Sequence, residues 1–209
     1  MIKTFVFNPI QVNCFVLYDT NKECAIVDPG AQSAQERQEL TDFISQNNLV
    51  VKHILLTHAH IDHICGAPYI TKHFSLPLEL GGGADKILRL LNAQASCFGF
   101  EETDFDTMPT KEIKESDTIC FGSSELKVIS TPGHCAGSVS FFNEKENYVL
   151  TGDALFAGGI GRTDLPTGDY NTLVYSITHN LFSLPSKTVC LTGHGSQTTI
   201  GVEKEGFIY

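Results

Sequence analysis

Four short β-rich runs in this chain each end directly in residues that can bind a metal ion. Five of the eight histidines lie in these endings, so histidine is distributed very unevenly. Each ending has a glycine close by, and glycine permits the left-handed or closely packed backbone that a loop around a site requires. The endings are Thr57-His58-Ala59-His60-Ile61-Asp62-His63, Thr131-Pro132-Gly133-His134, Thr151-Gly152-Asp153 and Thr192-Gly193-His194-Gly195. We therefore expect a site built from the ends of several strands.

Hydrophobic patterning predicts an α+β protein in which strands and helices take turns. Strands are expected at residues 4–7, 14–18, 24–27, 52–56, 118–121, 125–130, 139–143, 148–151 and 188–191. Helices are expected at residues 33–47, 66–74, 85–93 and 169–181, with an acidic loop over residues 97–105. Several consecutive strands have no helix between them, so a four-layer αββα sandwich fits better than a doubly wound parallel sheet.

The first ending carries the most specific pattern, His-x-His-x-Asp-His, which is rare by chance in a chain of 209 residues. His58 and His60 are two residues apart, so in an extended segment they project to the same side and can chelate one ion. Asp62 and His63 follow after the chain bends and can serve a second ion nearby. Imidazole and carboxylate ligands together suit zinc, iron or manganese better than calcium or magnesium.

The other three endings are weak signals when each is taken alone. A single histidine in a glycine loop, such as His134 or His194, is more often a solvated residue than a ligand. Asp153 alone is more often a turn residue or a helix cap. Their recurrence at strand ends, together with the first ending, favours a shared metal site.

Composition excludes several classes of function. The chain has a net charge of −10 and no cluster of lysine or arginine, so a nucleic-acid or anionic-membrane surface is not expected. Its apolar runs are too short to span a bilayer. Polar residues interrupt the first 13 positions, which argues against a signal peptide and for a cytoplasmic protein.

The seven cysteines form no Cys-x-x-Cys pair and are expected to be reduced and mostly buried. The oligomeric state is not indicated.

Taken in order, these motifs resemble the metallo-β-lactamase fold superfamily over nearly the whole chain. Within it, Thr131-Pro132-Gly133-His134 with Gly137-Ser138, and Gly152-Asp153-Ala154-Leu155-Phe156, look most like the glyoxalase II (hydroxyacylglutathione hydrolase) branch. Asn13 and Gly161-Arg162-Thr163-Asp164-Leu165 also fit the short bacterial form of that branch. The resemblance implies the αββα sandwich and a dinuclear site, with two divalent ions, zinc first and iron or manganese as alternatives. It implies that one metal is held by His58, His60 and His134, that the other is held by Asp62, His63 and His194, and that Asp153 bridges them.

The function that this resemblance implies is metal-dependent hydrolysis of a small, acidic thioester. Two cations sharing Asp153 and a water would lower the pKa of that water from 15.7 toward about 7, giving a bridging hydroxide that attacks the carbonyl. Asp62 would also hold or relay protons. Arg162 is expected to contact an anionic substrate, although pairing with Asp164 at the surface is an equal alternative.

Two departures from the family pattern concern the substrate. We expect residues 1–209 to form one domain without the C-terminal helical domain that grips glutathione in the full-length enzymes. The family's aromatic residue after the last histidine ligand is also missing, since Gly195-Ser196-Gln197 stands there. Two other activities therefore stay open on the same fold, namely a mononuclear-iron sulfur (persulfide) dioxygenase and a lactonase.

Overall fold

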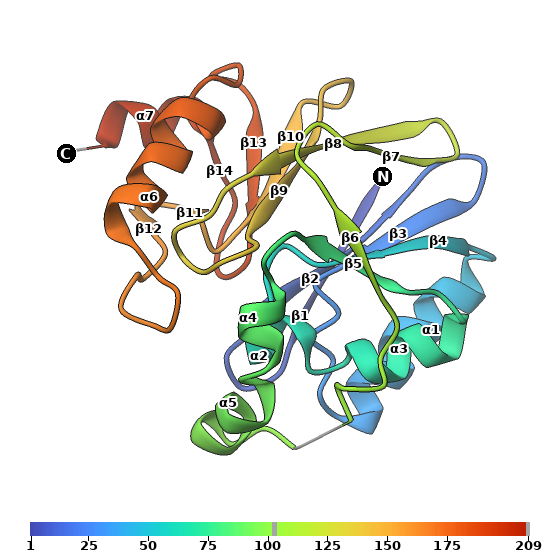
Figure 1. The fold of residues 1–209 in the computed structure, drawn as a ribbon. Coiled ribbons are helices and arrows are strands. Elements are labelled where there is room, and N and C mark those ends of the chain that lie inside the picture. The colour runs from blue at the N-terminus through green and yellow to red at the C-terminus, as the bar shows by residue number, and fades with distance from the viewer. Residues whose placement is uncertain (102–103, 208–209) are drawn as a thin grey trace.

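The computed structural model describes residues 1–101 and 104–207. Two mixed sheets of six strands each face one another, and helices cover the outer face of each (Figure 1). The strands are β1 (Ile2–Phe7), β2 (Val12–Tyr18), β3 (Glu23–Val27), β4 (Val50–Leu55), β5 (Leu78–Gly81), β6 (Thr110–Ile113), β7 (Thr118–Phe121), β8 (Ser124–Ser130), β9 (Val139–Asn143), β10 (Tyr148–Gly152), β11 (Leu155–Phe156), β12 (Gly159–Ile160), β13 (Val189–Thr192) and β14 (Thr198–Thr199). The helices are α1 (Ala34–Gln46), α2 (Ile61–Ile64), α3 (Ala67–Phe74), α4 (Asp85–Leu88), α5 (Leu91–Phe98), α6 (Tyr170–Tyr175), the π-helical turn η1 (Ser176–Leu181) and α7 (Ile200–Gly206).

The strand order explains why the two halves of the chain face each other. The first sheet runs β1-β2-β3-β4-β5-β6 and the second runs β14-β13-β10-β9-β8-β7. In the first sheet β1, β2 and β3 are antiparallel, whereas β4, β5 and β6 continue in parallel. In the second sheet β10 and β13 are parallel and the other neighbours are antiparallel.

Three apolar clusters fill the space between the four layers. The middle cluster lies between the sheets and includes Phe15, Leu55, Phe121 and Phe141. One outer cluster packs the first sheet against α1 to α5, and the other packs the second sheet against α6, η1 and α7. Strand β2 is buried over almost its whole length, as expected of a strand covered on both faces. The four-layer α+β sandwich is therefore confirmed.

The four metal-capable endings follow strands from both sheets. His58 lies three residues beyond the end of β4, and His134 lies four residues beyond the end of β8. Asp153 and His194 follow β10 and β13, which are neighbours in the second sheet. The two sheets thus bring segments far apart in sequence to one edge of the sandwich.

Several expected elements differ from the structure. The helix expected over residues 85–93 is two helices, α4 and α5, with residues 89 and 90 between them, and Ile87, Leu91 and Ala95 are buried. The loop expected over residues 97–105 begins inside α5, which ends at a left-handed Gly99. Residues 102 and 103 of that expected loop lie outside the described residues.

Other elements were not expected from the sequence. Strands β5 and β6 have only four residues each. The parallel pairing of β5 with β4, and of β6 with β5, joins segments that are distant in sequence. The β11–β12 hairpin, β14 and α7 were likewise not expected.

The expected helix over residues 169–181 is present as α6 followed directly by η1, with Asp169 as its N-cap.

All seven cysteines are free thiols, and five of them are buried, as the sequence predicts. Among the described residues, no helix is both long and apolar enough to cross a membrane.

Candidate metal centre

The first ending bends as its spacing predicts. His60 has an extended backbone and lies directly before α2, so Asp62 and His63 stand on a helical turn while His58 and His60 precede it. All four side chains are buried. The local sequence thus sends two histidines to one side of the bend and a carboxylate with a third histidine to the other.

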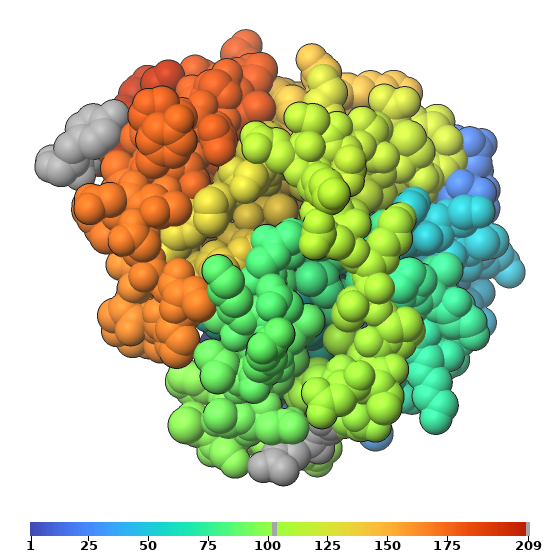
Figure 2. All heavy atoms as spheres, in the orientation of Figure 1, coloured from blue at the N-terminus to red at the C-terminus, as the bar shows by residue number. Residues whose placement is uncertain are grey.

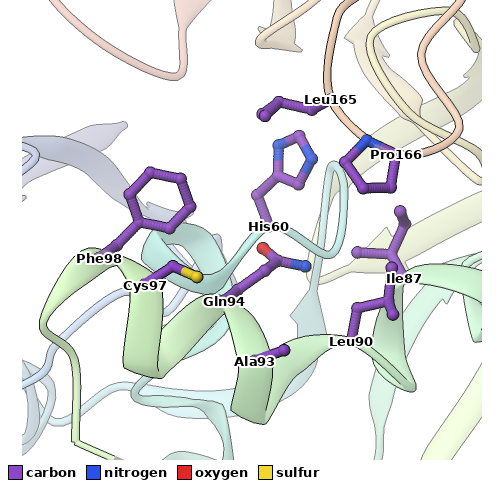
Figure 3. A pocket seen from close by; sticks show the side chains of 9 residues that line it. All are labelled: His60, Ile87, Leu90, Ala93, Gln94, Cys97, Phe98, Leu165 and Pro166. Carbon is purple, nitrogen blue, oxygen red and sulfur yellow. The ribbon is translucent and has the colours of Figure 1, made fainter.

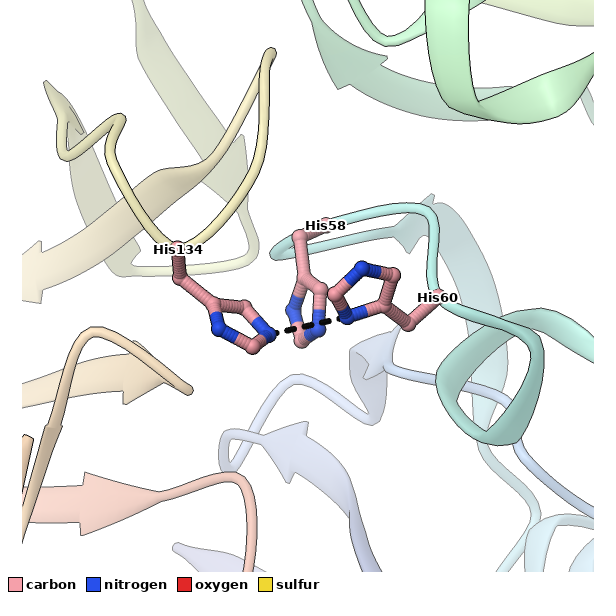
Figure 4. A group of neighbouring side chains, drawn as sticks. All are labelled: His58, His60 and His134. Atoms are coloured by element: carbon pink, nitrogen blue, oxygen red, sulfur yellow. Dashed lines mark hydrogen bonds between the residues drawn. The ribbon is translucent and has the colours of Figure 1, made fainter. Parts of the chain in front are cut away.

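His58, His60 and His134 form the first group of possible metal ligands. Their rings meet edge to face, with centroids 4.5–4.8 Å apart. His60 Nδ1 lies 2.8 Å from His134 Nε2 (Figure 4). Two ring nitrogens at this distance need either a proton or a cation between them, because two lone pairs repel each other.

Asp62, His63 and His194 form the second group. Asp62 Oδ2 lies 3.0 Å from His194 Nε2 and 3.5 Å from His63 Nε2. The two histidine Nε2 atoms are 3.3 Å apart. Three potential ligand atoms from α2 and from the loop after β13 therefore converge on one point.

Asp153 lies between the two groups. Its Oδ1 is 3.3 Å from His63 Nε2, and its Oδ2 is 3.7 Å from His134 Nε2 and 3.6 Å from His194 Nε2. His58 Nε2 lies 4.0 Å from Oδ2. The structure therefore brings all seven residues that the sequence singled out to one centre, with Asp153 in contact with both sides.

Two buried polar atoms at this centre indicate that a cation fits there. His58 Nε2 and Asp153 Oδ1 are buried and have no hydrogen-bond partner among the described residues. An unpaired buried polar atom costs about 1–3 kcal/mol. Both atoms are electron-pair donors that a metal ion accepts, and the surrounding donors are imidazole nitrogens and carboxylate oxygens, the set preferred by zinc, iron or manganese.

Burial keeps the first group of histidines neutral. It lowers the pKa of His58 well below its usual value, with a further contribution from nearby His63. It lowers the pKa of His60 to about 4, and it also lowers the pKa of His134. Neutral imidazole is the form that binds metals.

In the second group, protons on His63 and His194 balance the negative charge of the neighbouring carboxylates. Burial alone would lower the pKa of His63, but the carboxylates of Asp153 and Asp62 raise it well above its usual value. Burial also opposes a charge on His194, yet its hydrogen bond with Asp62 raises its pKa. Burial favours protonated Asp62 and Asp153, but the adjacent histidines hold the pKa of both below its usual value. Two buried carboxylates thus require positive charge here, which a bound cation supplies as well as protons do.

Asp28 orients His63 directly and His58 through Thr57, on the side of each ring that faces away from the centre. Its Oδ2 accepts hydrogen bonds from His63 Nδ1 at 2.9 Å and from Thr57 Oγ1 at 2.7 Å. Thr57 Oγ1 in turn lies 3.1 Å from His58 Nδ1. With Nδ1 of both rings engaged, Nε2 points into the centre. Asp28 directly follows β3, and its burial is the feature that reveals this role.

Backbone carbonyls orient two further histidines. His134 Nδ1 donates to the carbonyl of Arg162 at 2.7 Å, and His194 Nδ1 lies 3.1 Å from the carbonyls of Ile10 and Gln11. Asn13 fixes the loop that carries His194 by donating from Nδ2 to the carbonyls of Thr192 and Gly195. Carbonyl and carboxylate acceptors of this kind select the ring tautomer that leaves Nε2 free for a metal.

Arg162 pairs with Asp164 at the surface, which is one of the two alternatives that the sequence left open. Its guanidinium makes two hydrogen bonds to the Asp164 carboxylate, at 2.7 Å and 2.6 Å, and its side chain is 58% exposed. It also lines a cavity of about 240 Å³ whose other lining residues include His60, Asp62, Asp153 and His194.

The two cysteines near the centre are not needed as ligands. The Cys65 thiol donates to the Gly30 carbonyl, and the Cys135 thiol lies 3.4 Å from Ser138 Oγ. Burial raises the pKa of Cys135 to about 11, which keeps it a neutral thiol. Both are buried free thiols, in agreement with the expectation that the cysteines are reduced and mostly buried.

Known proteins resemble this chain over most of its length. The family model of the metallo-beta-lactamase superfamily matches residues 7–194. A hydroxyacylglutathione hydrolase, GloC, of Haemophilus influenzae is 37% identical over 93% of this chain and 90% of its own length. Among solved structures, the BLEG-1 B3 metallo-beta-lactamase is 35% identical with a TM-score of 0.87, covering 98% of this chain and 97% of that one. TTHA1623 in a di-iron-bound form is 29% identical with a TM-score of 0.87, covering 98% of both chains. The match to the family model and the identity to these relatives show that the chain belongs to the metallo-beta-lactamase superfamily.

Proposed function

We propose that this protein is a metal-dependent hydrolase that cleaves thioesters, in the manner of a hydroxyacylglutathione hydrolase. The observation that carries the proposal is the convergence of all seven histidine and aspartate side chains, with His58 Nε2 and Asp153 Oδ1 buried and without a hydrogen bond among the described residues. The similarity to the Haemophilus hydroxyacylglutathione hydrolase supports the choice of a thioester.

The proposed ligands follow the two groups of side chains. His58, His60 and His134 would hold one divalent ion; Asp62, His63 and His194 would hold the other; and Asp153 would contact both. When bound, divalent cations lower the pKa of coordinated water and polarise a carbonyl oxygen. The overall reaction adds the oxygen of water to the acyl carbon, breaks the carbon–sulfur bond and leaves a carboxylic acid and a thiol.

The chain's own residues would orient the ligands and handle protons. Asp28 and the Arg162 carbonyl hold the His63 and His134 rings so that Nε2 faces the centre. Asp62 Oδ2 and Asp153, both ionised, are the acceptors placed to take a proton during the reaction. Arg162 would leave Asp164 and bind the acidic part of the substrate at the mouth of the cavity.

Zinc is the metal that we propose first, and iron remains a specific alternative. The histidine and aspartate donors accept either metal. The similarity to TTHA1623, whose structure is a di-iron-bound form, favours including iron in every assay. A single iron with a persulfide substrate would correspond to the dioxygenase alternative, which needs only a subset of the seven residues.

The experiment is turnover of S-lactoylglutathione beside other thioesters, a lactone and a β-lactam, with metal content measured on the same sample. The β-lactam is included because a B3 metallo-beta-lactamase is among the structural relatives. Hydrolysis of thioesters by protein that holds two divalent ions per chain supports the proposal. Absence of thioester turnover in fully loaded protein contradicts it.

A further inference from the structure

An apolar groove of about 280 Å³ opens beside the candidate metal centre. Its floor is formed by α4 and α5, and its opposite wall is the segment after β12 (Figure 3). The surface is hollowed between these two segments, which are green and orange in Figure 2. The apolar side chains that line it are Ile87, Leu90, Ala93, Phe98, Leu165 and Pro166.

The groove is continuous with the cavity that contains the metal-binding side chains. His60, Gln94, Phe98 and Leu165 line both. Figure 3 places the His60 ring between the side chains of α5 and those of Leu165 and Pro166. Gln94 is fixed at this junction because its Oε1 accepts a hydrogen bond from Ile61 N at 3.1 Å. A molecule whose reacting carbonyl lies at the metal centre can therefore extend directly into the groove.

The chemistry of the groove contrasts with that of the centre. None of its lining residues, all of which the structure describes, carries a carboxylate, ammonium or guanidinium group. Phe98 lines the groove and is 48% exposed, so part of the apolar lining faces solvent. Exposed apolar surface that is concave and adjoins convergent polar groups is typical of a ligand site.

We propose that this groove binds an apolar acyl chain attached to the scissile thioester, so that the preferred substrates carry a longer and less polar acyl group than lactoyl. The inference rests on the proposed function, since it takes the metal centre as the place where the thioester carbonyl reacts. Glutathione is a charged peptide and does not match the lining of the groove. The acyl side of the substrate is therefore the part that enters it.

The test is a series of thioesters that share one thiol, glutathione, and differ in the acyl group: lactoyl, acetyl, butanoyl and hexanoyl. Burial of each methylene group should raise kcat/KM about fourfold until the groove is filled. A second series, with one acetyl group and thiols of increasing apolar length, should show no such rise. A flat acyl series, or a rise confined to the thiol series, would overturn the inference.

Ala93→Glu places a carboxylate in the groove while keeping a residue that favours helix. It should reduce the ratio of kcat/KM for hexanoyl to that for lactoyl thioester by about tenfold, within the range that pocket contacts produce. The control is Asn92→Glu, which adds the same charge at the next exposed position of α5, outside the groove. The control should keep the wild-type ratio. Equal ratios in Ala93→Glu and wild type would overturn the inference.

A binding measurement separates this inference from the proposed function. S-alkyl glutathiones, in which a methylene replaces the thioester carbonyl, cannot be hydrolysed but retain the apolar chain. If no thioester is turned over, the proposed function fails. Calorimetric titration with these thioethers then tests separately whether the groove binds an apolar chain. Tighter binding with longer chains that Ala93→Glu abolishes supports the groove as an apolar subsite, whereas binding independent of chain length or of Ala93→Glu overturns it.

Discussion

The carboxylate of Asp28 accepts a hydrogen bond from His63 Nδ1 across 2.9 Å, in a position where both side chains are almost fully buried. The same carboxylate accepts from the Thr57 backbone N–H and hydroxyl. Through these bonds Asp28 connects the end of β3 with the segment that carries His58 and His63. The candidate centre thus depends on a residue that is not itself among the possible ligands.

Asp28→Asn tests this connection. Asparagine tolerates the left-handed backbone of residue 28, whose φ is 53°, so the turn should persist. The neutral amide is a weaker partner for His63, and metal affinity should fall about 10- to 100-fold, as is typical when an outer hydrogen bond to a ligand is lost. Metal competition with a chelator gives the Kd. Asp42→Asn, an exposed change on α1, is the control; equal affinity in both variants would contradict the role of Asp28.

His60→Ala should lose metal and activity together. His60 Nδ1 lies 2.8 Å from His134 Nε2 in the first group, so its removal takes away one of three nitrogens. Loss of activity should exceed about 100-fold, because the loss of an outer partner alone costs up to that much. His73→Ala removes an exposed histidine outside the centre and should change neither quantity. Full activity in His60→Ala would refute the assignment of the site.

Gly193→Ala should damage the centre by crowding it. A Cβ at residue 193 would lie 2.1 Å from Asp153 Oδ1 and 2.8 Å from His63 Cε1, so both side chains or the backbone of residue 193 must shift. We expect a loss of about 1–3 kcal/mol in unfolding free energy, as for overpacking, together with a lower metal content. At Gly159 an added Cβ meets nothing within 4 Å, so Gly159→Ala is the matched control. The prediction is wrong if Gly193→Ala retains the wild-type metal content.

Arg162→Ala tests the proposed contact with an acidic substrate. Because the guanidinium is exposed, its ion pairs are weak, and KM for acidic thioesters should rise by no more than about fivefold with little change in kcat. Asp164→Asn frees Arg162 from its present partner and should lower KM instead. Steady-state kinetics with acidic and neutral thioesters gives both values. An unchanged KM for every acidic thioester in Arg162→Ala would exclude the binding role.

Glu79 should make stability depend on acidic pH. Burial would raise its pKa, but hydrogen bonds from His53 and Lys111 hold the pKa below its usual value. Its stabilisation is therefore complete above the unfolded pKa of about 4.3 and is lost as pH falls through the lower folded pKa. Glu79→Gln should cost about 1–3 kcal/mol at neutral pH and flatten this dependence. Denaturant unfolding at several pH values checks it, with the exposed Glu112→Gln as control; parallel pH profiles of wild type and Glu79→Gln would contradict it.

The fold class and the seven candidate metal ligands could be predicted from the sequence, because the patterns that indicate them lie within short stretches of the chain. His58, His60, Asp62 and His63 lie within one six-residue stretch, and His134, Asp153 and His194 each follow a recognisable strand. What could not be read were contacts that depend on the assembled sandwich. The bond from Asp28 to His63 joins residues 35 apart, and the groove forms only when α5 and Leu165 come together.

Metal stoichiometry and thioester turnover, measured on one sample purified without added metal and then loaded in steps, test the central claim most directly. The account predicts that hydrolysis of S-lactoylglutathione rises with bound divalent metal, reaches its maximum at two ions per chain and needs no oxygen. One iron per chain, with oxygen-dependent formation of sulfite from a persulfide and no thioester hydrolysis, would contradict it.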